Sequence, residues 1–253
     1  MSTRVVAVLN QKGGVGKTTT TANLSFALAQ KGFKVTVIDL DPQGHLAISL
    51  GVTKPQTTGI DQVMLGNSDI EQQTINVREN LKLVVAGIGL RDIEELTEGG
   101  AQRGDLLRRA LHEHLNDHDF VFIDCPPSSG ILVANALFAA DEILIPMSSD
   151  FLALQGLSHL LGTIKHFEKV LKKQYKQMLI ISRFSTTRRI SKEVLAVLKK
   201  HFPRQILATV IREAALLAEC PGLGKTVLEY KPGSRSARDF RQLANDYLEG
   251  KVM

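Results

Sequence analysis

The segment from residue 11 to residue 19, QKGGVGKTT, has the residue types that a loop needs to hold a chain of phosphates. Backbone N–H groups must come within hydrogen-bonding reach of phosphate oxygens there, and glycine removes the side chains that would obstruct them. Lys17 can reach the terminal phosphates as a flexible cation, and the Thr18 hydroxyl can coordinate Mg²⁺. The alternative is a glycine-rich turn without a ligand, which the three glycines and the Lys–Thr pair together disfavour.

This segment departs from the usual P-loop pattern, GxxxxGK[ST], at its first position. Gln11 stands where that pattern has glycine, and a second lysine, Lys12, follows it. The loop comes after an apolar run and before an amphipathic stretch, as a P-loop between a strand and a helix requires. The residues predicted to bind the phosphates are Lys12, Gly13, Gly14, Val15, Gly16, Lys17, Thr18 and Thr19.

Carboxylates end two further apolar runs, in the sequences VIDLDPQ and FIDCPP. Ligands of open α/β sheets lie beyond the carboxyl ends of the strands, so these side chains are expected beside the phosphate loop. Asp124 fits a carboxylate that holds Mg²⁺ directly or through water, and Asp41 is placed to orient an attacking water. A lone aspartate after a strand is as often a helix cap, so the argument depends on the convergence of all three strand ends.

Apolar runs alternate with longer amphipathic stretches along the whole chain, which predicts an α/β fold with a mainly parallel sheet and helices on both faces. Residues 51–80 are polar and turn-rich, and we interpret them as a surface excursion inside a single domain that spans 1–253. Strands are expected at 4–10, 34–39, 81–86, 119–124, 142–146, 178–183 and 206–211. Helices are expected at 17–31, 103–115, 130–140, 151–174, 190–201 and 235–248.

Charge is distributed unevenly along the chain. Residues 165–253 carry 19 Lys or Arg and 8 Asp or Glu, whereas residues 1–164 carry 12 and 18. A basic C-terminal third suggests a surface for a polyanion, with nucleic acid first, and a solvated lysine-rich face is an equally good interpretation from charge alone. Cys125 and Cys220 form no CxxC pair, which disfavours a zinc or iron–sulfur site within one chain and favours a reducing cytosol. No apolar segment is long enough to span a bilayer.

The motifs KGGVGKTT, DLDPQGH and FIDCPPS resemble those of the ParA/MinD group of deviant Walker-A ATPases, and DPQG with the sequence from 217 to 244 resembles the ParA branch. The resemblance covers nearly the whole chain. It implies a P-loop NTPase that binds ATP with Mg²⁺, hydrolyses it to ADP and phosphate, and has weak basal activity stimulated by a partner. By position, Lys12 matches the signature lysine that crosses a dimer interface, Lys17 the P-loop lysine, and Asp41 a residue needed for hydrolysis. The resemblance also assigns Thr18, Asp39 and Asp124 to the metal, Thr19 to phosphate, and Pro221 to the adenine side.

Two stretches depart from the ParA pattern. The arginine that ParA proteins use for DNA corresponds to Leu216, and the usual DxRT stretch is replaced by residues 185–189, STTRR. We expect other basic residues to contact DNA phosphates instead, with binding that weakens steeply as salt rises. The candidates are Arg188, Arg189, Lys192, Lys199 and Lys200 on or near one helix, and Arg235, Arg238 and Arg241 on the last one.

By this resemblance the chain is expected to act as a cytoplasmic, nucleoid-associated switch that dimerises on ATP, binds DNA without sequence preference, and segregates or positions a plasmid or chromosome. A ParB-like or cargo-adaptor protein is the expected activator. Three alternatives stay open: positioning of a protein cargo such as a chemoreceptor cluster or carboxysome, a MinD-like membrane-associated ATPase, and an amidotransferase-like ligase or metallocluster carrier. Membrane association is not expected, because the last helix lacks the bulky apolar residues of an interfacial anchor.

Overall fold

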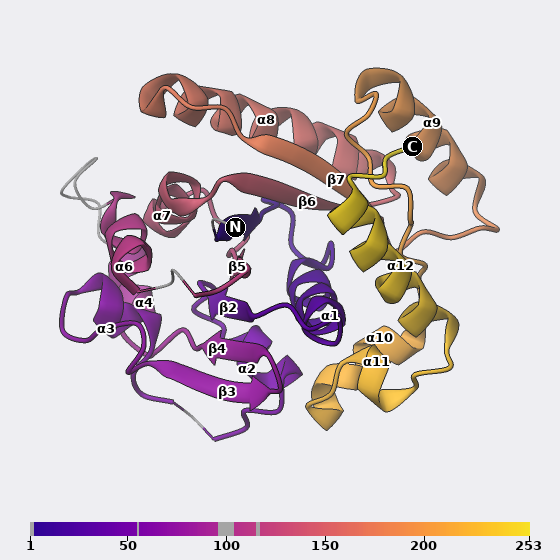
Figure 1. The fold of residues 1–253 in the computed structure, drawn as a ribbon. Coiled ribbons are helices and arrows are strands. Elements are labelled where there is room, and N and C mark those ends of the chain that lie inside the picture. Colours follow the sequence, from indigo (N-terminus) through magenta and orange to yellow (C-terminus); the bar gives the residue numbers. More distant parts are fainter. Residues whose placement is uncertain (1–2, 55, 96–103, 115–116) are drawn as a thin grey trace.

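A seven-stranded sheet in the order β3-β4-β2-β5-β1-β6-β7 forms the centre of the molecule (Figure 1). The computed structural model describes residues 3–54, 56–95, 104–114 and 117–253. Neighbouring strands are parallel except for the antiparallel pair β3 and β4. The strands are β1 (Arg4–Val8), β2 (Val35–Asp39), β3 (Thr74–Arg78), β4 (Leu81–Val84), β5 (Phe120–Asp124), β6 (Glu142–Ser148) and β7 (Lys176–Ser182). The predicted α/β class with a mainly parallel sheet is confirmed.

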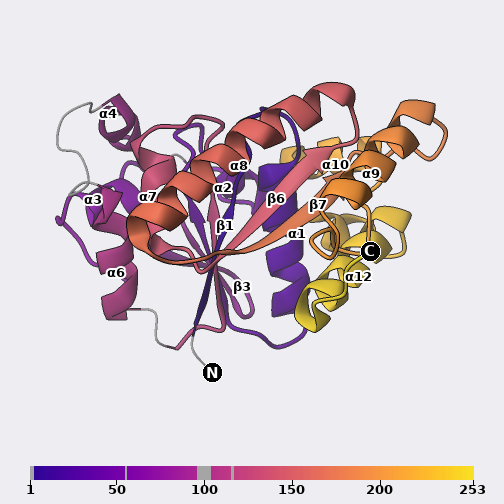
Figure 2. The same cartoon turned by 90° about the horizontal axis from the view of Figure 1, so that it is seen from above.

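Helices cover both faces of this sheet (Figures 1 and 2). They are α1 (Lys17–Ala29), α2 (His45–Ser49), α3 (Ile60–Met64), α4 (Leu90–Glu95), α6 (Leu106–His114), α7 (Ile131–Ala139), α8 (Phe151–Leu171), α9 (Arg189–His201), α10 (Ala215–Glu219), α11 (Val227–Tyr230) and α12 (Arg235–Glu249), with a 3₁₀ turn at Cys220–Leu223. The six predicted helices all correspond to helices of the structure; of the range 103–115, residues 103 and 115 lie outside the described residues. In the described part of the chain, no helix is both long and apolar enough to cross a membrane.

Two apolar cores lie on opposite faces of the sheet, and alternate residues of one strand enter each. In β1, Val6 and Val8 pack in the core that includes α1 and α12, whereas Ala7 and the following Leu9 pack with α7 and α8. All four side chains are fully buried. Successive side chains of a strand point to opposite faces, so a central strand covered on both sides must be apolar throughout, as these residues are.

Two predictions need correction. Residues 51–80 are not only a surface excursion, because they contain α3, with Ile60 fully buried, and the edge strand β3. Residues 206–211 do not form a regular strand. This segment follows the edge of β7 through hydrogen bonds at its two ends, from the Leu207 N–H to the Leu179 carbonyl and from the Ile211 N–H to the Ile181 carbonyl. In a regular parallel ladder the Ile181 carbonyl would accept from the N–H of Thr209, two residues after Leu207. It accepts from Ile211 instead, so two extra residues interrupt the ladder.

The strand order brings the three motifs to one edge of the sheet. β5 lies between β2 and β1, and Asp124 is the Cα partner of both Asp39 and Val8 in the register. The loops that follow these three parallel strands therefore emerge side by side. β6 and β7 add their carboxyl ends on the other side of β1.

Candidate functional site

The glycine-rich loop connects β1 to α1, as the sequence predicts. Its backbone turns through left-handed conformations at Gly14, with φ 73°, and at Gly16, with φ 88°. A side chain at either position would be strained, and a Cβ at Gly13 would meet nothing within 4 Å, so the loop keeps an open concave side. Gly16 is the N-cap of α1, and its side-chain-free backbone leaves the positive end of the helix facing the loop.

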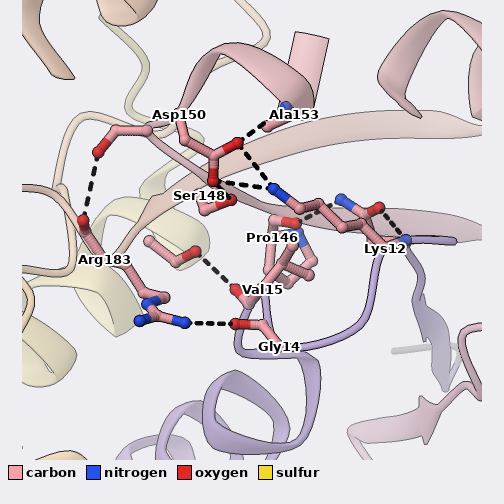
Figure 3. A network of polar contacts seen from close by, with 11 residues as sticks. Lys12, Gly14, Val15, Pro146, Ser148, Asp150, Ala153 and Arg183 are labelled. Carbon is pink, nitrogen blue, oxygen red and sulfur yellow. Dashed lines mark hydrogen bonds and ion pairs between the residues drawn. The ribbon is translucent and has the colours of Figure 1, made fainter. Parts of the chain in front are cut away.

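Neighbouring strand ends hold the outer side of the loop. The Asn10 side chain accepts a hydrogen bond from the Lys12 N–H at 2.9 Å and donates to the Pro146 carbonyl at 2.8 Å. On the other side, Ser182 donates to the Val15 carbonyl at 2.6 Å and Arg183 donates to the Gly14 carbonyl at 3.2 Å (Figure 3). These carbonyls face the strand ends. Asn10, Ser182 and Arg183 are not among the predicted site residues, although each lies just at or beyond the end of a buried strand.

The two lysines of the loop take different directions. Lys17 is 7% exposed, and its ammonium lies 3.4 Å from the Lys12 carbonyl inside the loop. Burial lowers the pKa of Lys17, against the charge of Asp124, which acts to raise it. The Lys12 side chain is 34% exposed and extends away from the loop to Asp150, which it contacts at 2.7 and 2.9 Å (Figure 3). The Lys17 ammonium thus lies inside its own loop, whereas the Lys12 ammonium lies outside it.

Asp124 is buried beneath the start of α1. Its Oδ1 atom accepts a hydrogen bond from the Thr21 hydroxyl at 3.1 Å. Its Oδ2 atom is buried and accepts no hydrogen bond from the described residues. Burial raises the pKa of Asp124 to about 7, although the hydroxyls of Thr18 and Thr21 and the charge of Lys17 act to lower it. A buried carboxylate oxygen without a partner, beside the Thr18 hydroxyl, fits a Mg²⁺ ion.

Asp39 lies beside Asp124 on the neighbouring strand and has a different environment. Its two oxygens accept hydrogen bonds from the N–H groups of Asp41 at 3.2 Å and Leu46 at 3.1 Å. Burial, followed by the charge of Asp124, raises the pKa of Asp39 well above its usual value. In this conformation Asp39 holds the segment that carries Asp41. The metal roles of Asp39, Asp124 and Thr18 stay predictions, as does the role of Asp41 in hydrolysis.

The described residues contain no group of three or more His, Cys, Asp or Glu side chains that could hold a metal. Mg²⁺ does not require such a group, because it is usually held by one or two carboxylates together with substrate phosphates and water. Cys125 and Cys220 are both buried, and burial raises the pKa of each thiol.

A cavity of about 430 Å³ opens beside the loop, large enough for a nucleoside. Gly14, Gly16, Thr19 and Thr20 line one side, and Arg183 with the segment from Ile211 to Ala218 lines the other. Thr19 also borders a small hollow with Pro221. The structure therefore brings Pro221 near the start of α1, and its role on the adenine side stays a prediction. The larger cavity also contains Arg183 and Glu213, which form an ion pair at 3.2 Å.

The predicted DNA-binding residues lie on two helices that pack against different cores. Arg188 is the N-cap residue of α9 and forms an ion pair with Glu213. Arg189 forms an ion pair with Glu193. Within the described part of the chain, Lys192, Lys199 and Lys200 form no ion pair and are exposed. On α12, Arg238 and Arg241 donate to the carbonyls of residues 233 and 232, and Arg235 is exposed. The eight residues are therefore divided between α9, with its N-cap, and α12.

A glycine-rich loop between a parallel strand and a helix, with carboxylates ending the adjacent strands, defines a P-loop NTPase of the α/β class. The family model described as AAA domain, AAA_31, matches residues 3–177. The chain belongs to this family, within its ParA/Soj branch.

Two curated relatives and one solved structure are similar over almost the whole chain. The sporulation initiation inhibitor protein Soj of Bacillus subtilis is 35% identical over 96% of this chain and 97% of its own. The chromosome partitioning protein ParA of Myxococcus xanthus is 32% identical over 97% of this chain and 88% of its own. A crystal structure of cobyrinic acid a,c-diamide synthase from Mycobacterium smegmatis, with a bound ATP analogue and magnesium, has a TM-score of 0.82 and 31% identity, covering 98% of this chain and 95% of that one.

Proposed function

We propose that residues 1–253 form one ATPase domain that acts as a dimeric switch, hydrolysing ATP to ADP and phosphate and binding DNA in its ATP state. The opposite directions of Lys17 and Lys12 carry this proposal. Lys17 is buried beside its own loop, whereas the Lys12 ammonium extends outward and is free to reach the phosphates of a second subunit once it leaves Asp150. A cation supplied by a partner subunit stabilises charge in phosphoryl transfer as an arginine finger does.

The roles of the other residues follow from their positions. The backbone of Gly13 to Gly16 and the ammonium of Lys17 would bind the phosphates of ATP, while the Thr18 hydroxyl and Asp124 would hold Mg²⁺. When bound, Mg²⁺ neutralises the charge that develops between the phosphates. Asp41 would orient the attacking water, held in place by the hydrogen bond from its own N–H to Asp39. Thr19, which borders both the cavity and the small hollow, would contact the phosphates, and Pro221, which borders the hollow, would lie on the adenine side.

DNA binding is the proposed output of the switch. The exposed lysines of α9 would contact DNA phosphates, and a dimer would present two such helices, so that avidity strengthens binding only in the ATP state. The proposed setting is the nucleoid in the cytoplasm, with a ParB-like or cargo-adaptor protein stimulating a slow basal hydrolysis. Segregation or positioning of a plasmid or chromosome is the proposed role, and the name of the chromosome partitioning relative ParA supports it.

The dimer is tested by comparing Lys12→Ala with Lys17→Ala. Wild-type protein should be monomeric with ADP and dimeric with a nonhydrolysable ATP analogue in analytical ultracentrifugation. Lys17→Ala should lose nucleotide affinity by about 10- to 100-fold, because it removes charged hydrogen bonds to phosphate. Lys12→Ala should keep nucleotide affinity within about threefold, since its ammonium does not face its own loop, yet lose both dimerisation and hydrolysis. A Lys12→Ala protein that dimerises and hydrolyses ATP normally would refute the proposal.

The DNA step has a separate test. Binding to nonspecific duplex DNA should be tight only with the ATP analogue, and should weaken steeply between about 50 and 200 mM salt. If the protein binds no DNA with any nucleotide, DNA binding is refuted, and two alternatives that share the dimer mechanism are tested next: a membrane ATPase and a protein-positioning ATPase. Co-sedimentation with anionic vesicles would identify a MinD-like membrane ATPase, and co-purification with a protein encoded beside it would identify a protein cargo.

The name of the solved Mycobacterium smegmatis structure raises an amide-forming synthase as a rival. Cys125 and Cys220 are the only cysteines of the chain, both are buried, and burial raises the pKa of each thiol. Neither is placed to attack glutamine, which leaves a ligase without a thiol nucleophile for ammonia release. Hydrolysis of ATP by the purified protein without any acid or ammonia would separate the two, because a synthase needs both substrates to turn over.

A further inference from the structure

The Asp150 carboxylate forms a preorganised acceptor for the Lys12 ammonium (Figure 3). Asp150 is the N-cap residue of α8, and its Oδ1 atom accepts a hydrogen bond from the Ala153 N–H at 3.1 Å. The Ser148 hydroxyl donates to Oδ2 at 2.6 Å. Both oxygens are therefore held in place by groups of the same chain, independently of Lys12.

Lys12 is held in a matching way. The hydrogen bond from its N–H to Asn10 fixes the start of the side chain, and Asn10 is itself bonded to Pro146 at the end of β6. Asp150 lies two residues beyond the end of that same strand. The lysine and its acceptor are thus both positioned by β6, and the ammonium contacts both carboxylate oxygens at 2.7 and 2.9 Å. Burial acts to raise the pKa of Asp150, but Lys12 and Ser148 outweigh it and keep the pKa below its usual value.

We propose that Asp150 is a positioning residue that holds Lys12 within its own chain and thereby sets how readily the subunits dimerise. The proposal rests on the dimeric function proposed above, in which Lys12 acts on a second subunit. Lys12 cannot keep both contacts with Asp150 while its ammonium lies on a partner's phosphates. Closure of a dimer must therefore break two such ion pairs, one in each subunit.

The size of the effect on dimerisation follows from how exposed the Lys12 and Asp150 side chains are. The side chains of Lys12 and Asp150 are 34% and 46% exposed, so each pair stabilises the monomer no more than an exposed ion pair does. This corresponds to about 1.4- to 5-fold in the dimer dissociation constant for each pair. Two pairs then lower the stability of the dimer by about 2- to 25-fold. Because the pair is partly exposed, high salt should weaken it and so reduce its effect on the dimer dissociation constant.

Asp150→Asn is the appropriate variant, because asparagine is as good an N-cap as aspartate and removes only the charge. With a nonhydrolysable ATP analogue and Mg²⁺, its dimer dissociation constant should fall by about 2- to 25-fold relative to wild type in analytical ultracentrifugation. Glu193→Gln is the matched control. It also neutralises one carboxylate of a partly exposed ion pair, but its partner is Arg189 on α9, so it should leave dimerisation unchanged. An Asp150→Asn dimer as weak as wild type, or weaker, overturns the proposal.

A second measurement examines the pair without any dimer. Acylation of the Lys12 amine by an N-hydroxysuccinimide ester in the monomer, followed by mass spectrometry, should be faster in Asp150→Asn and unchanged in Glu193→Gln, with the exposed Lys199 as internal reference. Equal Lys12 rates in Asp150→Asn and wild type would overturn the proposal. If Asp150 slows the acylation of Lys12 but Lys12→Ala still forms the dimer, the contact between Lys12 and Asp150 is supported and the proposed dimeric function is refuted. Asp150→Ser, which also keeps a capping side chain, replaces Asp150→Asn if the latter folds poorly.

Discussion

Asp39 and Asp124 occupy paired positions on the neighbouring strands β2 and β5, yet their carboxylates are used in different ways. Both oxygens of Asp39 accept backbone N–H groups of the segment from Asp41 to Leu46. Asp124 has one buried oxygen, Oδ2, with no hydrogen bond from the described residues. One carboxylate therefore holds a loop, and the other keeps a coordination position available next to Thr18.

Asp124→Asn should separate stability from function. It removes a buried charge that has only one hydrogen-bonded oxygen, so the protein without Mg²⁺ should be more stable by about 1 kcal/mol, or about 2–4 °C in Tm. The same change should abolish Mg²⁺-dependent ATP hydrolysis, since an amide is a much poorer magnesium ligand than a carboxylate. Thermal denaturation and a phosphate-release assay measure the two effects. A variant that is less stable and still active would exclude Asp124 from the metal site.

Gly16→Ala should lose stability and nucleotide binding together. Its φ of 88° costs a side chain about 1–2 kcal/mol, and the Cβ would stand where α1 meets the phosphate loop. Gly32→Ala provides a matched control, because Gly32 has φ 89°, follows the other end of α1, and a Cβ there meets nothing within 4 Å. Both variants should show similar shifts in urea denaturation, whereas only Gly16→Ala should weaken ATP binding measured by calorimetry. Equal ATP affinities in the two variants would contradict a phosphate site at this loop.

The ion pair between Arg78 and Glu229 predicts a stability difference that depends on pH. Burial acts to raise the pKa of Glu229, but Arg78 and then the Thr226 N–H and hydroxyl lower it below the usual 4.5. A lowered carboxylate pKa contributes stability above the unfolded value, and this contribution is lost as pH falls through the folded value. Glu229→Gln should therefore be less stable than wild type by about 1–2 kcal/mol at pH 7, with the difference shrinking below about pH 4.5.

This pair also supports the nucleotide side of the site. Arg78 donates to the Gly224 carbonyl, and Glu229 accepts from Thr226, so together they hold the turn that follows Pro221. Glu229→Gln should accordingly weaken ATP binding several-fold at pH 7. Urea denaturation from about pH 3.5 to 7 and calorimetry at pH 7 provide the measurements. A stability difference that grows on acidification would show that the sign of the linkage is wrong.

Among the candidate DNA contacts, the exposed lysines of α9 should matter more than Arg189. Lys199 and Lys200 form no ion pair within the described residues, whereas Arg189 is paired with Glu193 at 2.6 Å. Lys199→Ala with Lys200→Ala removes four lysines from a dimer and should reduce the salt slope of its DNA binding by up to about 3.6, or about 0.9 for each phosphate that is no longer neutralised. Arg189→Ala should reduce it by less. The measurement is a binding series in KCl with the ATP analogue, and an unchanged slope for the double variant would remove α9 from the DNA surface.

Local sequence was sufficient for the phosphate loop and for most of the sheet. Glycines that need left-handed angles, followed by Lys17 and Thr18, identify the loop because the chemistry of phosphate binding constrains each position. The buried strands were equally evident, since strands covered on both faces are apolar throughout. The strand β3 was missed because an antiparallel edge strand with only partly buried side chains has no such signal. The segment 206–211 has the composition of a strand, but the Ile181 carbonyl pairs with Ile211, four residues after Leu207, so two extra residues interrupt the pairing.

Tertiary structure decided how the predicted residues are used. Sequence placed Asp39, Asp41 and Asp124 at strand ends, but only the register of β2 and β5 and the hydrogen bonds around them distinguish a loop anchor from an available ligand. Likewise, Lys12 and Asp150 are 138 residues apart, so no local pattern could pair them. Their contact exists because β6 runs parallel to β1 in the sheet, which brings the residue after one strand beside the loop after the other.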